Sequence, residues 1–556
     1  MHNAPMPDTF LPQRWLLVLF ALFTVVWFST LEYRKLIKPD EGRYAEIARE
    51  MAVSGDWVTP RLNGIKYFEK PPLQYWVTAA AFKTFGENEW TARLWPGITG
   101  FASVLLAFLV GRRLFGSDTA ILASAILGST LFYVVIGHLN TLDMGLALFL
   151  NLALSGFLLA NQSRASSQEA RRSMLATWAG LALAVLSKGI VALVLAGGSL
   201  VVYSLLARDF APWRRLELAR GLPLFLLIAA PWFIAVSLAN PEFPRFFFIH
   251  EHFERFLTKV HHRYQPWWYF VPVFAVGALP WTLMALQGLA AARRDEDRAV
   301  FRPRLFLGVW VFVVFTFFSL SDSKLPSYIL PLFPAAALLA ADAAQRWTRR
   351  TLLIHLGIVA AGAAVAILLL PQITRYADEE TPHAMILAYS HWLTWGAVIW
   401  FAGALGALVL AWKRRPHLAL LCLAIAAFAG NTLYLQGHEK LGRSNSAYHI
   451  ARQVEPMLAP GVPFYSVNMY EQTLPFYLQR TVILVDYTDE MKFGLQQEPE
   501  RWIPTLDEFA ARWRRDADAF AVMKKDIYRS FRNQGLPMEI VAEDTRRIIV
   551  RKPQQP

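Results

Sequence analysis

Charged side chains are scarce in this sequence of 556 residues: they make up 17% of it, against about a quarter in average soluble proteins. Hydrophobic residues make up 55%, which excludes an ordinary soluble domain and indicates a polytopic membrane protein. The chain has one cysteine, Cys422, inside an apolar run. An internal disulfide is therefore excluded, and cysteine usage says nothing about the redox compartment.

Glycine-rich phosphate-binding loops are also lacking, and no segment between the apolar runs is long enough for a cytosolic nucleotide-binding domain. The net charge of +13 comes from arginine and lysine spread over short loops. Such loops are typical of the cytoplasmic side of a membrane, so the charge indicates topology and not nucleic-acid binding.

About thirteen apolar runs are long enough, or nearly so, to span a bilayer as helices. Closed barrels use shorter strands, so we predict an α-helical protein. The first run lacks a cleavage pattern and is predicted to be an anchor with a cytoplasmic amino terminus. The runs are 14–31, 94–111, 118–136, 144–160, 174–188, 189–207, 221–239, 267–289, 305–320, 326–344, 352–370, 391–411 and 418–435.

The resulting topology predicts a membrane domain over residues 1–435, with two large outer loops at 32–93 and 240–266. Residues 436–556 lose membrane hydrophobicity, and short β-prone runs alternate there with helical stretches, which predicts a small soluble α/β domain. The four runs are Pro463–Val467, Thr481–Val485, Ala519–Met523 and Arg547–Arg551. Most unusual polar residues fall on the outer face. Chemistry there, away from nucleotides, requires an activated substrate embedded in lipid.

The first outer loop begins with an amphipathic pattern that predicts a helix lying at the membrane interface. Asp40 could simply cap this helix. However, Asp40 and Glu41 stand close in sequence to Arg43, Glu69 and Lys70, and mixed charge at the membrane edge is typical of a ligand site.

Lys70 precedes two prolines, which can simply stiffen the entry to a helix. The lysine itself can extend to lipid headgroups or bind a lipid phosphate. Asp143 could cap the next helix, whereas Lys188 is expected just below the outer surface, where it lines a cavity. Tyr328 either belongs to an aromatic belt or donates its hydroxyl to a phosphate.

A metal site is a further hypothesis. Glu69, His250 and His252 offer oxygen and nitrogen ligands suited to a divalent ion such as zinc. Their spacing is a weak signal, and contacts between the histidines and lipid headgroups are the favoured alternative.

The sequence resembles the GT-C membrane glycosyltransferases, specifically the bacterial aminoarabinose transferases, which are related to protein O-mannosyltransferases. The resemblance covers essentially the whole chain. It rests on five blocks: Asp40–Ile47, Gly55–Gly64, Tyr67–Pro72, Glu251–His252 with Arg255–Phe256, and Lys324–Tyr328.

The resemblance implies transfer of 4-amino-4-deoxy-L-arabinose from undecaprenyl phosphate to lipid A phosphates, at the periplasmic face of the bacterial inner membrane. The added sugar would reduce binding of polymyxin and other cationic peptides. Transfer to protein or another glycan is the alternative, and a lipid transporter is a more distant one. We assign Asp40, Arg43 and Asp143 to catalysis, Lys70, Arg255 and Tyr328 to the donor phosphate, and Tyr67, Glu41 and Lys188 to the substrate cavity.

Overall fold

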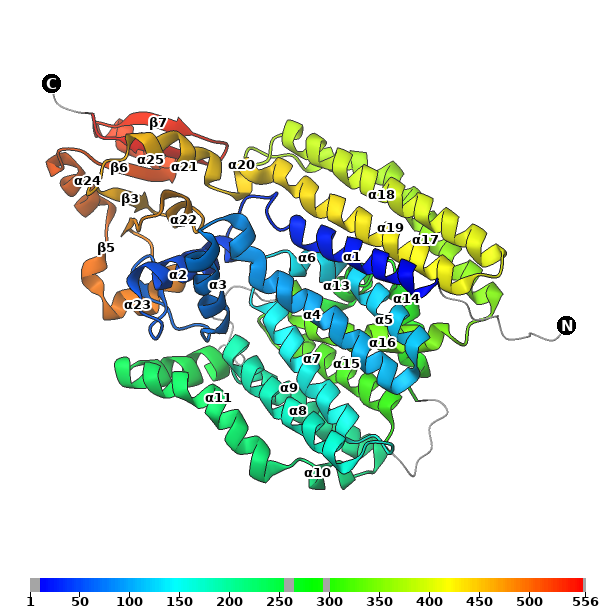
Figure 1. The fold of residues 1–556 in the computed structure, drawn as a ribbon. Coiled ribbons are helices and arrows are strands. Elements are labelled where there is room, and N and C mark those ends of the chain that lie inside the picture. The colour runs from blue at the N-terminus through cyan, green and yellow to red at the C-terminus, as the bar shows by residue number, and fades with distance from the viewer. Residues whose placement is uncertain (1–10, 255–264, 294–300, 554–556) are drawn as a thin grey trace.

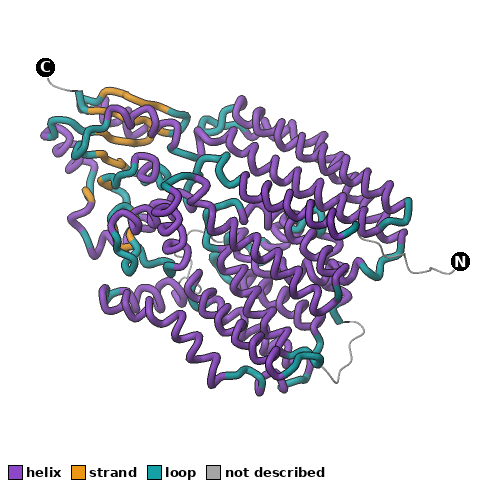
Figure 2. Tube along the Cα trace, viewed as in Figure 1, coloured by secondary structure: helices purple, strands orange, loops and turns teal. Residues whose placement is uncertain are grey.

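The computed structural model describes residues 11–254, 265–293 and 301–553. Long helices form a bundle, and a small α/β domain packs against one end of it (Figure 1). Within the described residues, the strands gather at this same end (Figure 2). We call it the loop end: it contains α2 (Asp40–Ser54), α3 (Leu73–Phe85) and the C-terminal sheet.

The predicted apolar runs coincide with helices or helix pairs. Among the described residues, eight helices are long and apolar enough to cross a membrane, or up to ten if each of two bent pairs counts as one span. The multi-pass helical class is confirmed, whereas the count of thirteen is not. The elements are α1 (Gln13–Ser29), α4 (Glu89–Phe115), α5 (Ser117–Ser129), α6 (Leu131–Gly137), α7 (Asp143–Ala160), α8 (Ser167–Lys188), α9 (Val191–Ala207), α10 (Ala211–Arg214), α11 (Leu218–Ala239), α13 (Phe270–Gly277), α14 (Thr282–Ala291), α15 (Pro303–Leu320), η2 (Pro326–Leu332), α16 (Phe333–Ala344), α17 (Arg349–Leu369), η3 (Leu370–Tyr376), α18 (His383–Trp412) and α19 (Pro416–Gly437).

Proline and glycine explain how these helices bend and pack. The pair α13 and α14 bends by 112° around a break that contains Pro280, whereas the pair α5 and α6 bends by 64° at Thr130. Glycine lets α18 and α19 approach closely, because a Cβ on Gly430 would lie 2.8 Å from the carbonyl oxygen of Gly396. Lipid provides no hydrophobic driving force between helices, so the close van der Waals packing that small residues permit stabilises helix contacts.

The C-terminal domain contains a six-stranded sheet in the order β5-β4-β3-β6-β8-β7. Strands β3 to β6 pair in parallel, and the last two pair antiparallel. The four strands predicted from β-prone runs are β3 (Phe464–Val467), β4 (Ile483–Val485), β6 (Phe520–Lys524) and β8 (Arg547–Arg551), while β5 (Trp502–Ile503) and β7 (Glu539–Glu543) were not predicted. Two residues are too few for a sequence pattern, and most of β7 is polar or exposed at the sheet edge.

Helices cover the sheet and connect it to the bundle. In chain order they are η4 (His438–Leu441), α20 (Gly442–Asn445), α21 (Tyr448–Val454), η5 (Glu455–Met457), α22 (Leu474–Leu478), η6 (Asp489–Met491), α23 (Lys492–Gln497), η7 (Pro499–Arg501), α24 (Leu506–Arg515) and α25 (Lys525–Asn533). One apolar cluster includes Ile47 of α2, Ile450 of α21 and Leu484 of β4. The C-terminal domain therefore shares its core with α2.

Helix α2 forms where the sequence predicts it and ends at Gly55, whose φ of 73° permits the left-handed C-cap. Its place at a membrane interface stays a prediction, but its polar face does not meet water. The polar face is buried, since Arg43, Glu46 and Arg49 are each at most 6% exposed. Arg49 pairs with Glu46 at 2.6 Å. Paired charges let the C-terminal domain cover a face that would otherwise require water.

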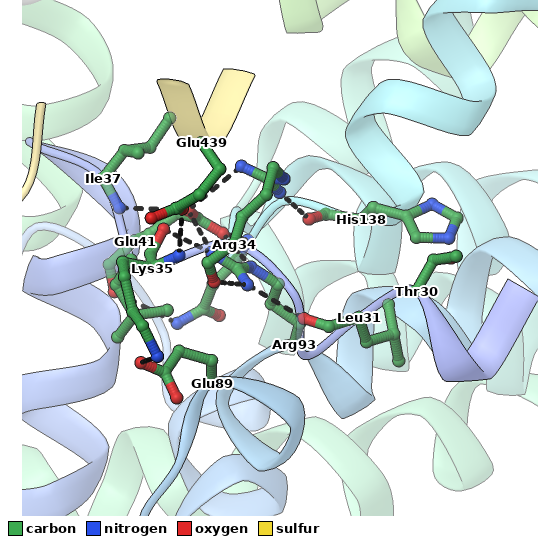
Figure 3. Close-up of polar contacts among 12 residues, drawn as sticks. Thr30, Leu31, Arg34, Lys35, Ile37, Glu41, Glu89, Arg93, His138 and Glu439 are labelled. Carbon is green, nitrogen blue, oxygen red and sulfur yellow. Dashed lines mark hydrogen bonds and ion pairs between the residues drawn. The ribbon is translucent and has the colours of Figure 1, made fainter. Parts of the chain in front are cut away.

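A buried arginine ties α4 to the start of α2 (Figure 3). Arg93 donates to both carboxylate oxygens of Glu41, at 2.6 and 2.9 Å. Its remaining N–H groups reach the carbonyls of Leu31, Arg34 and Lys35 at 2.6 to 2.9 Å. All five guanidinium donors are thereby used, and the chain after α1 is fixed against α2.

Replacing this arginine should destabilise the protein strongly. We expect Arg93→Ala to lower the free energy of unfolding by about 3–5 kcal/mol, because the Glu41 charge would stay buried without its main partner. Thermal unfolding in detergent, followed by tryptophan fluorescence, measures the change. The control is Arg113→Ala, which breaks an exposed pair with Glu169 and should change stability by less than about 1 kcal/mol. Equal effects of the two variants would contradict the structural role of Arg93.

Near the other end of α2, Glu50 is a second buried carboxyl group. It accepts a hydrogen bond from the Gly64 backbone N–H at 2.7 Å, which ties α2 to the hairpin of β1 (Arg61–Leu62) and β2 (Ile65–Lys66). Burial and the neighbouring Glu46 carboxylate raise the pKa of Glu50 from 4.5 to about 8. The folded protein therefore holds a proton here that the unfolded chain releases.

This proton makes stability depend on pH. Between about pH 4.5 and 8 the folded state binds more protons at Glu50 than the unfolded state, so the contribution of Glu50 to stability falls as pH rises through this window. We expect Glu50→Gln to flatten the stability profile and to be more stable than the parent at pH 8. Thermal unfolding of both proteins at pH 5 to 9 checks this. Parallel profiles would show that Glu50 is ionised in the folded state.

Candidate functional site

Asp40 stands in the first turn of α2 at the loop end, where its carboxylate is partly exposed. It does not cap the helix: the N-cap is Pro39, and no side-chain capping bond is formed. Instead its Oδ1 lies 3.1 Å from Nη1 of Arg43. The same guanidinium donates to Glu490 of η6, at 2.6 and 3.2 Å. Arg43 is thus fixed from two sides and holds one oxygen of the Asp40 carboxylate.

Tyrosines line the inner side of this cluster. Tyr67 is 3% exposed, and its hydroxyl has no hydrogen-bond partner among the described residues. Burial and the charge of Glu69 raise its pKa, so the hydroxyl keeps its proton. Glu69 also raises the pKa of Tyr44 and Tyr75, although burial is the larger cause for both. Tyr67 is therefore a proton-bearing donor within electrostatic reach of Arg43 and Glu69.

Lys70 lies between two structural elements. Its Nζ is 3.2 Å from Oε2 of Glu251 in η1 (Arg245–Glu254) and 2.8 Å from the carbonyl oxygen of Glu69. Glu251 stands in one of the sequence blocks, but its pairing with Lys70 was not predicted. Arg255, the other cation assigned to the donor phosphate, lies outside the described residues.

A second cation sits at the C-terminal end of α8. The Lys188 ammonium contacts Oδ1 of Asp143, the first residue of α7, and lies 4.4 Å from the ring centre of Tyr328 in η2. Asp143 makes no capping bond. The structure thus brings together three predicted residues, and only 14% of the Lys188 side chain is exposed.

The two cation clusters belong to adjacent elements. Leu73, at the start of α3, packs against an apolar cluster that includes Val185 of α8. Asn140, in the turn before Asp143, donates its backbone N–H to Glu41 at 3.0 Å and receives a side-chain bond from Gln74 at 2.7 Å. Cations, tyrosines and one partly exposed carboxylate therefore gather at one edge of the bundle, which is an arrangement suited to binding phosphate.

Glu41 requires a correction. We assigned it to the substrate cavity, but its carboxylate is 2% exposed and is held by Arg93 and by backbone N–H groups. Burial alone would raise the pKa of Glu41, but Arg93 and Arg34 outweigh it and lower the pKa to about 2. Glu41 is a permanent charge that supports its neighbour Asp40. Arg93 was missed because it stands at the edge of an apolar run.

The metal hypothesis stays a prediction, because only Glu69 and His250 among its three residues have described side chains. No group of three or more His, Cys, Asp or Glu side chains converges within the parts of the chain that the structure covers. Glu69 and Glu251 both lie beside the Lys70 cation, which competes with a metal. His250 stacks on Phe246 at 5.2 Å, and the side chain of His252 lies outside the described residues.

Comparison with known proteins agrees with this arrangement. Residues 14–293 match the family model for dolichyl-phosphate-mannose-protein mannosyltransferases, and residues 450–552 match the aminoarabinose transferase C-terminal domain. An undecaprenyl phosphate-alpha-4-amino-4-deoxy-L-arabinose arabinosyl transferase from Erwinia tasmaniensis is 31% identical over 94% of this chain and 95% of its own length. The chain belongs to this arabinosyl transferase family.

Solved structures show the same relationship. The crystal structure of ArnT from Cupriavidus metallidurans bound to undecaprenyl phosphate is 39% identical, with a TM-score of 0.94 over 98% of this chain and all of that one. The archaeal oligosaccharyltransferase of Archaeoglobus fulgidus shares only the fold, at 14% identity and a TM-score of 0.53 over 93% of this chain and 70% of that one. The chain is a multi-pass membrane glycosyltransferase that uses a lipid-linked sugar.

The pair of Lys188 and Asp143 should be energetically coupled. We expect a double-mutant cycle of Asp143→Asn, Lys188→Met and the combined variant to give a coupling of about 1–3 kcal/mol, because each single change leaves a partly buried charge without its partner. Unfolding in detergent measures stability for the four proteins. The control cycle uses Arg452 and Glu455, an exposed pair expected to couple by less than about 1 kcal/mol. Additive effects at Asp143 and Lys188 would show that water already screens both charges.

Proposed function

We propose that this protein transfers 4-amino-4-deoxy-L-arabinose from undecaprenyl phosphate to a phosphate group of lipid A. The observation that carries the proposal is the gathering of Asp40, Arg43 and Lys70 at one end of a membrane bundle that matches a structure bound to undecaprenyl phosphate throughout its length. Named relatives of nearly the same length support the identity of the sugar.

The orientation of the bundle in the membrane is inferred from the positions of its basic residues. Clustered basic residues lie at the end of the bundle away from the α/β domain (Figure 1): Arg112 and Arg113 in the last turn of α4, and Lys413–Arg415 between α18 and α19. The positive-inside rule assigns that end to the cytoplasm. The loop end then faces the periplasm of the inner membrane, where both lipids are accessible without a nucleotide.

For the reaction we propose a single displacement at the anomeric carbon of the sugar. An oxygen of the lipid A phosphate attacks this carbon, and the bond to the undecaprenyl phosphate oxygen breaks, so the polyprenyl phosphate leaves with the bonding electrons. Positive charge develops on the sugar and negative charge on the leaving phosphate. Lys70, with Arg255 and Tyr328, stabilises the leaving phosphate.

Asp40 acts on the sugar or on the acceptor. Its partly exposed carboxylate, oriented by Arg43, stabilises the positive charge on the sugar or positions the acceptor. A strong general base is not required, because a phosphate monoester with a second pKa of about 6 is already largely ionised at neutral pH. A protein hydroxyl as acceptor would require Asp40 to remove a proton. A phosphate acceptor therefore requires no general base from the site, whereas a hydroxyl acceptor does.

The metal hypothesis enters no step of this mechanism. Lys70 already supplies positive charge where a divalent ion would otherwise neutralise the leaving phosphate.

The consequence in the cell is a cationic sugar on lipid A, which masks negative charge and reduces binding of polymyxin and other cationic peptides.

Mass spectrometry of lipid A tests the function directly. Cells lacking their own transferase receive the parent chain, Asp40→Asn or Lys70→Met at matched membrane levels. We expect aminoarabinose on lipid A with the parent and at least a hundredfold less with either variant, equal to about 2.7 kcal/mol of transition-state stabilisation. The matched controls are Asp118→Asn, in the first turn of α5, and Lys413→Met, beyond α18, both at the opposite end of the bundle.

The outcomes separate the alternatives. Modification by the parent and by Asp40→Asn would keep the enzyme but remove the carboxylate from its mechanism. An unmodified lipid A in all strains, with a new sugar on protein or another glycan, would identify a different acceptor. Unchanged glycans with altered lipid distribution between the leaflets would favour a transporter.

A further inference from the structure

Two basic segments meet at the end of the bundle away from the α/β domain. Nη2 of Arg349, the first residue of α17, donates to the carbonyl oxygen of Trp412, the last residue of α18, at 2.8 Å. The guanidinium also lies 4.6 Å from the centre of the Trp412 ring, a distance typical of a cation–π contact. The start of α17 is thereby fixed beside the loop between α18 and α19, and Figure 1 shows these helices side by side.

We call the surface formed by these segments the basic patch. It consists of Arg349, Arg350, Lys413, Arg414 and Arg415, of which Arg349 is half-buried and the other four are exposed. Helices α17, α18 and α19 contain no aspartate or glutamate. No carboxylate in the described part of the chain pairs with any of the five cations. The basic patch thus carries positive charge that these three helices do not neutralise.

Basic residues near other helix ends do have acidic partners. The pairs are Arg113 with Glu169 at 3.2 Å, Arg171 with Glu217 at 3.6 Å, and Arg304 with Asp342 at 2.8 Å. The positive-inside rule requires basic residues at this end of the bundle, but it does not require three neighbouring helices without a single carboxylate. The basic patch therefore differs from an ordinary topological signal.

Two helix ends add to its positive charge. Helix α17 begins at Arg349 and α19 begins at Pro416, and neither has an acidic residue in its first turn. Aligned peptide dipoles place partial positive charge at such ends, where an anion is stabilised. An anion at the basic patch would therefore interact with side-chain cations and with two helix ends at once.

Exposed apolar side chains lead away from the basic patch along both helices. On α18, Val409 and Trp412 are three residues apart and share one face, and Trp412 is 68% exposed. On α17, the exposed Ile354 and Ile358 follow Arg350 at intervals of four residues. Exposed tryptophan is typical of the headgroup level of a bilayer. The cations are thus placed at headgroup depth, next to surfaces suited to acyl chains.

From these observations we propose that the basic patch binds an anionic phospholipid, with its phosphates on the cations and its acyl chains along α17 and α18. A zwitterionic lipid fits less well, because the three helices offer no carboxylate for a headgroup amine. Five cations exceed the charge of one phosphate, so a headgroup with two phosphates, such as that of cardiolipin, fits best. Such a lipid is a bound ligand and not a substrate, and its binding does not depend on the proposed transfer reaction.

Titration of the purified full chain with cardiolipin in detergent tests the proposal. Native mass spectrometry counts the bound lipid, and thermal unfolding measures the stabilisation. The patch variant combines Arg350→Gln with Arg414→Gln, which removes two exposed cations and leaves Arg349 on Trp412. The matched control combines Arg112→Gln with Arg113→Gln, which removes two exposed cations from the last turn of α4 at the same end of the bundle.

We expect cardiolipin to bind the parent and the control with the same apparent Kd. The patch variant should bind it at least about tenfold more weakly, because each basic residue near anionic headgroups adds to the attraction. Binding to the parent should also weaken as the salt concentration rises from about 0.1 to 0.5 M, since salt screens exposed charges. Phosphatidylcholine should bind all three proteins equally.

Other results would overturn the proposal. Equal weakening in the patch variant and the control would show that the net charge of this end attracts the lipid without a defined site. Equal stabilisation by inorganic phosphate and by cardiolipin would identify a site for a free anion. A parent chain that does not distinguish cardiolipin from phosphatidylcholine would reduce the basic patch to a topological signal.

Photo-cross-linking locates the lipid directly. Cardiolipin with a photoreactive group on an acyl chain is irradiated with the full chain, and the labelled peptides are identified by mass spectrometry. Labels within residues 349–358 and 405–415 that decrease in the patch variant would support the proposal. Labels confined to other helices, such as α1 or α11, would overturn it.

Discussion

The loop end depends on one interaction, the bidentate pair of Arg93 and Glu41. Arg93 comes from a spanning helix, and Glu41 stands beside Asp40, so the pair transmits the rigidity of the bundle to the residue assigned to catalysis. Glu41 also receives the backbone N–H of Asn140, which positions the turn before Asp143. Glu41 thereby positions the segments that carry two candidate carboxylates, Asp40 and Asp143, from distant parts of the chain.

Burial of charge explains why the protein needs its C-terminal domain. Helix α2 has an apolar and a polar face, and both are covered. Arg43 pairs with Glu490 of that domain, and apolar residues of α2 share a core with its strands. Removing water from paired charges strengthens their attraction but makes each partner indispensable. The domain is thus part of the site architecture, although its sequence shows no catalytic motif.

Much of this could be predicted from sequence, because length, hydropathy and local motifs act over short distances. The spans and four strands follow from apolar periodicity, and the charged segment from Asp40 to Lys70 is visible at the membrane edge. The partners could not be predicted. Arg93 and Glu490 carry no local signal, and the burial of α2 depends on a domain about 400 residues away in sequence. Of the two sharp bends, the one between α13 and α14 has Pro280 at its break, whereas no proline stands at the break between α5 and α6.

The two lysines show how such a site remains stable before substrate arrives. Lys70 rests against Glu251 and Lys188 against Asp143, so neither cation is buried without an anion. In the proposed function, a phosphate that binds Lys70 would replace or share Glu251, so part of the attraction already present would be kept. Paired cations therefore bind phosphate less strongly than unpaired cations would, which allows the site to release a charged lipid. Since a transferase must release a polyprenyl phosphate after every turnover, paired cations suit this chemistry better than isolated ones.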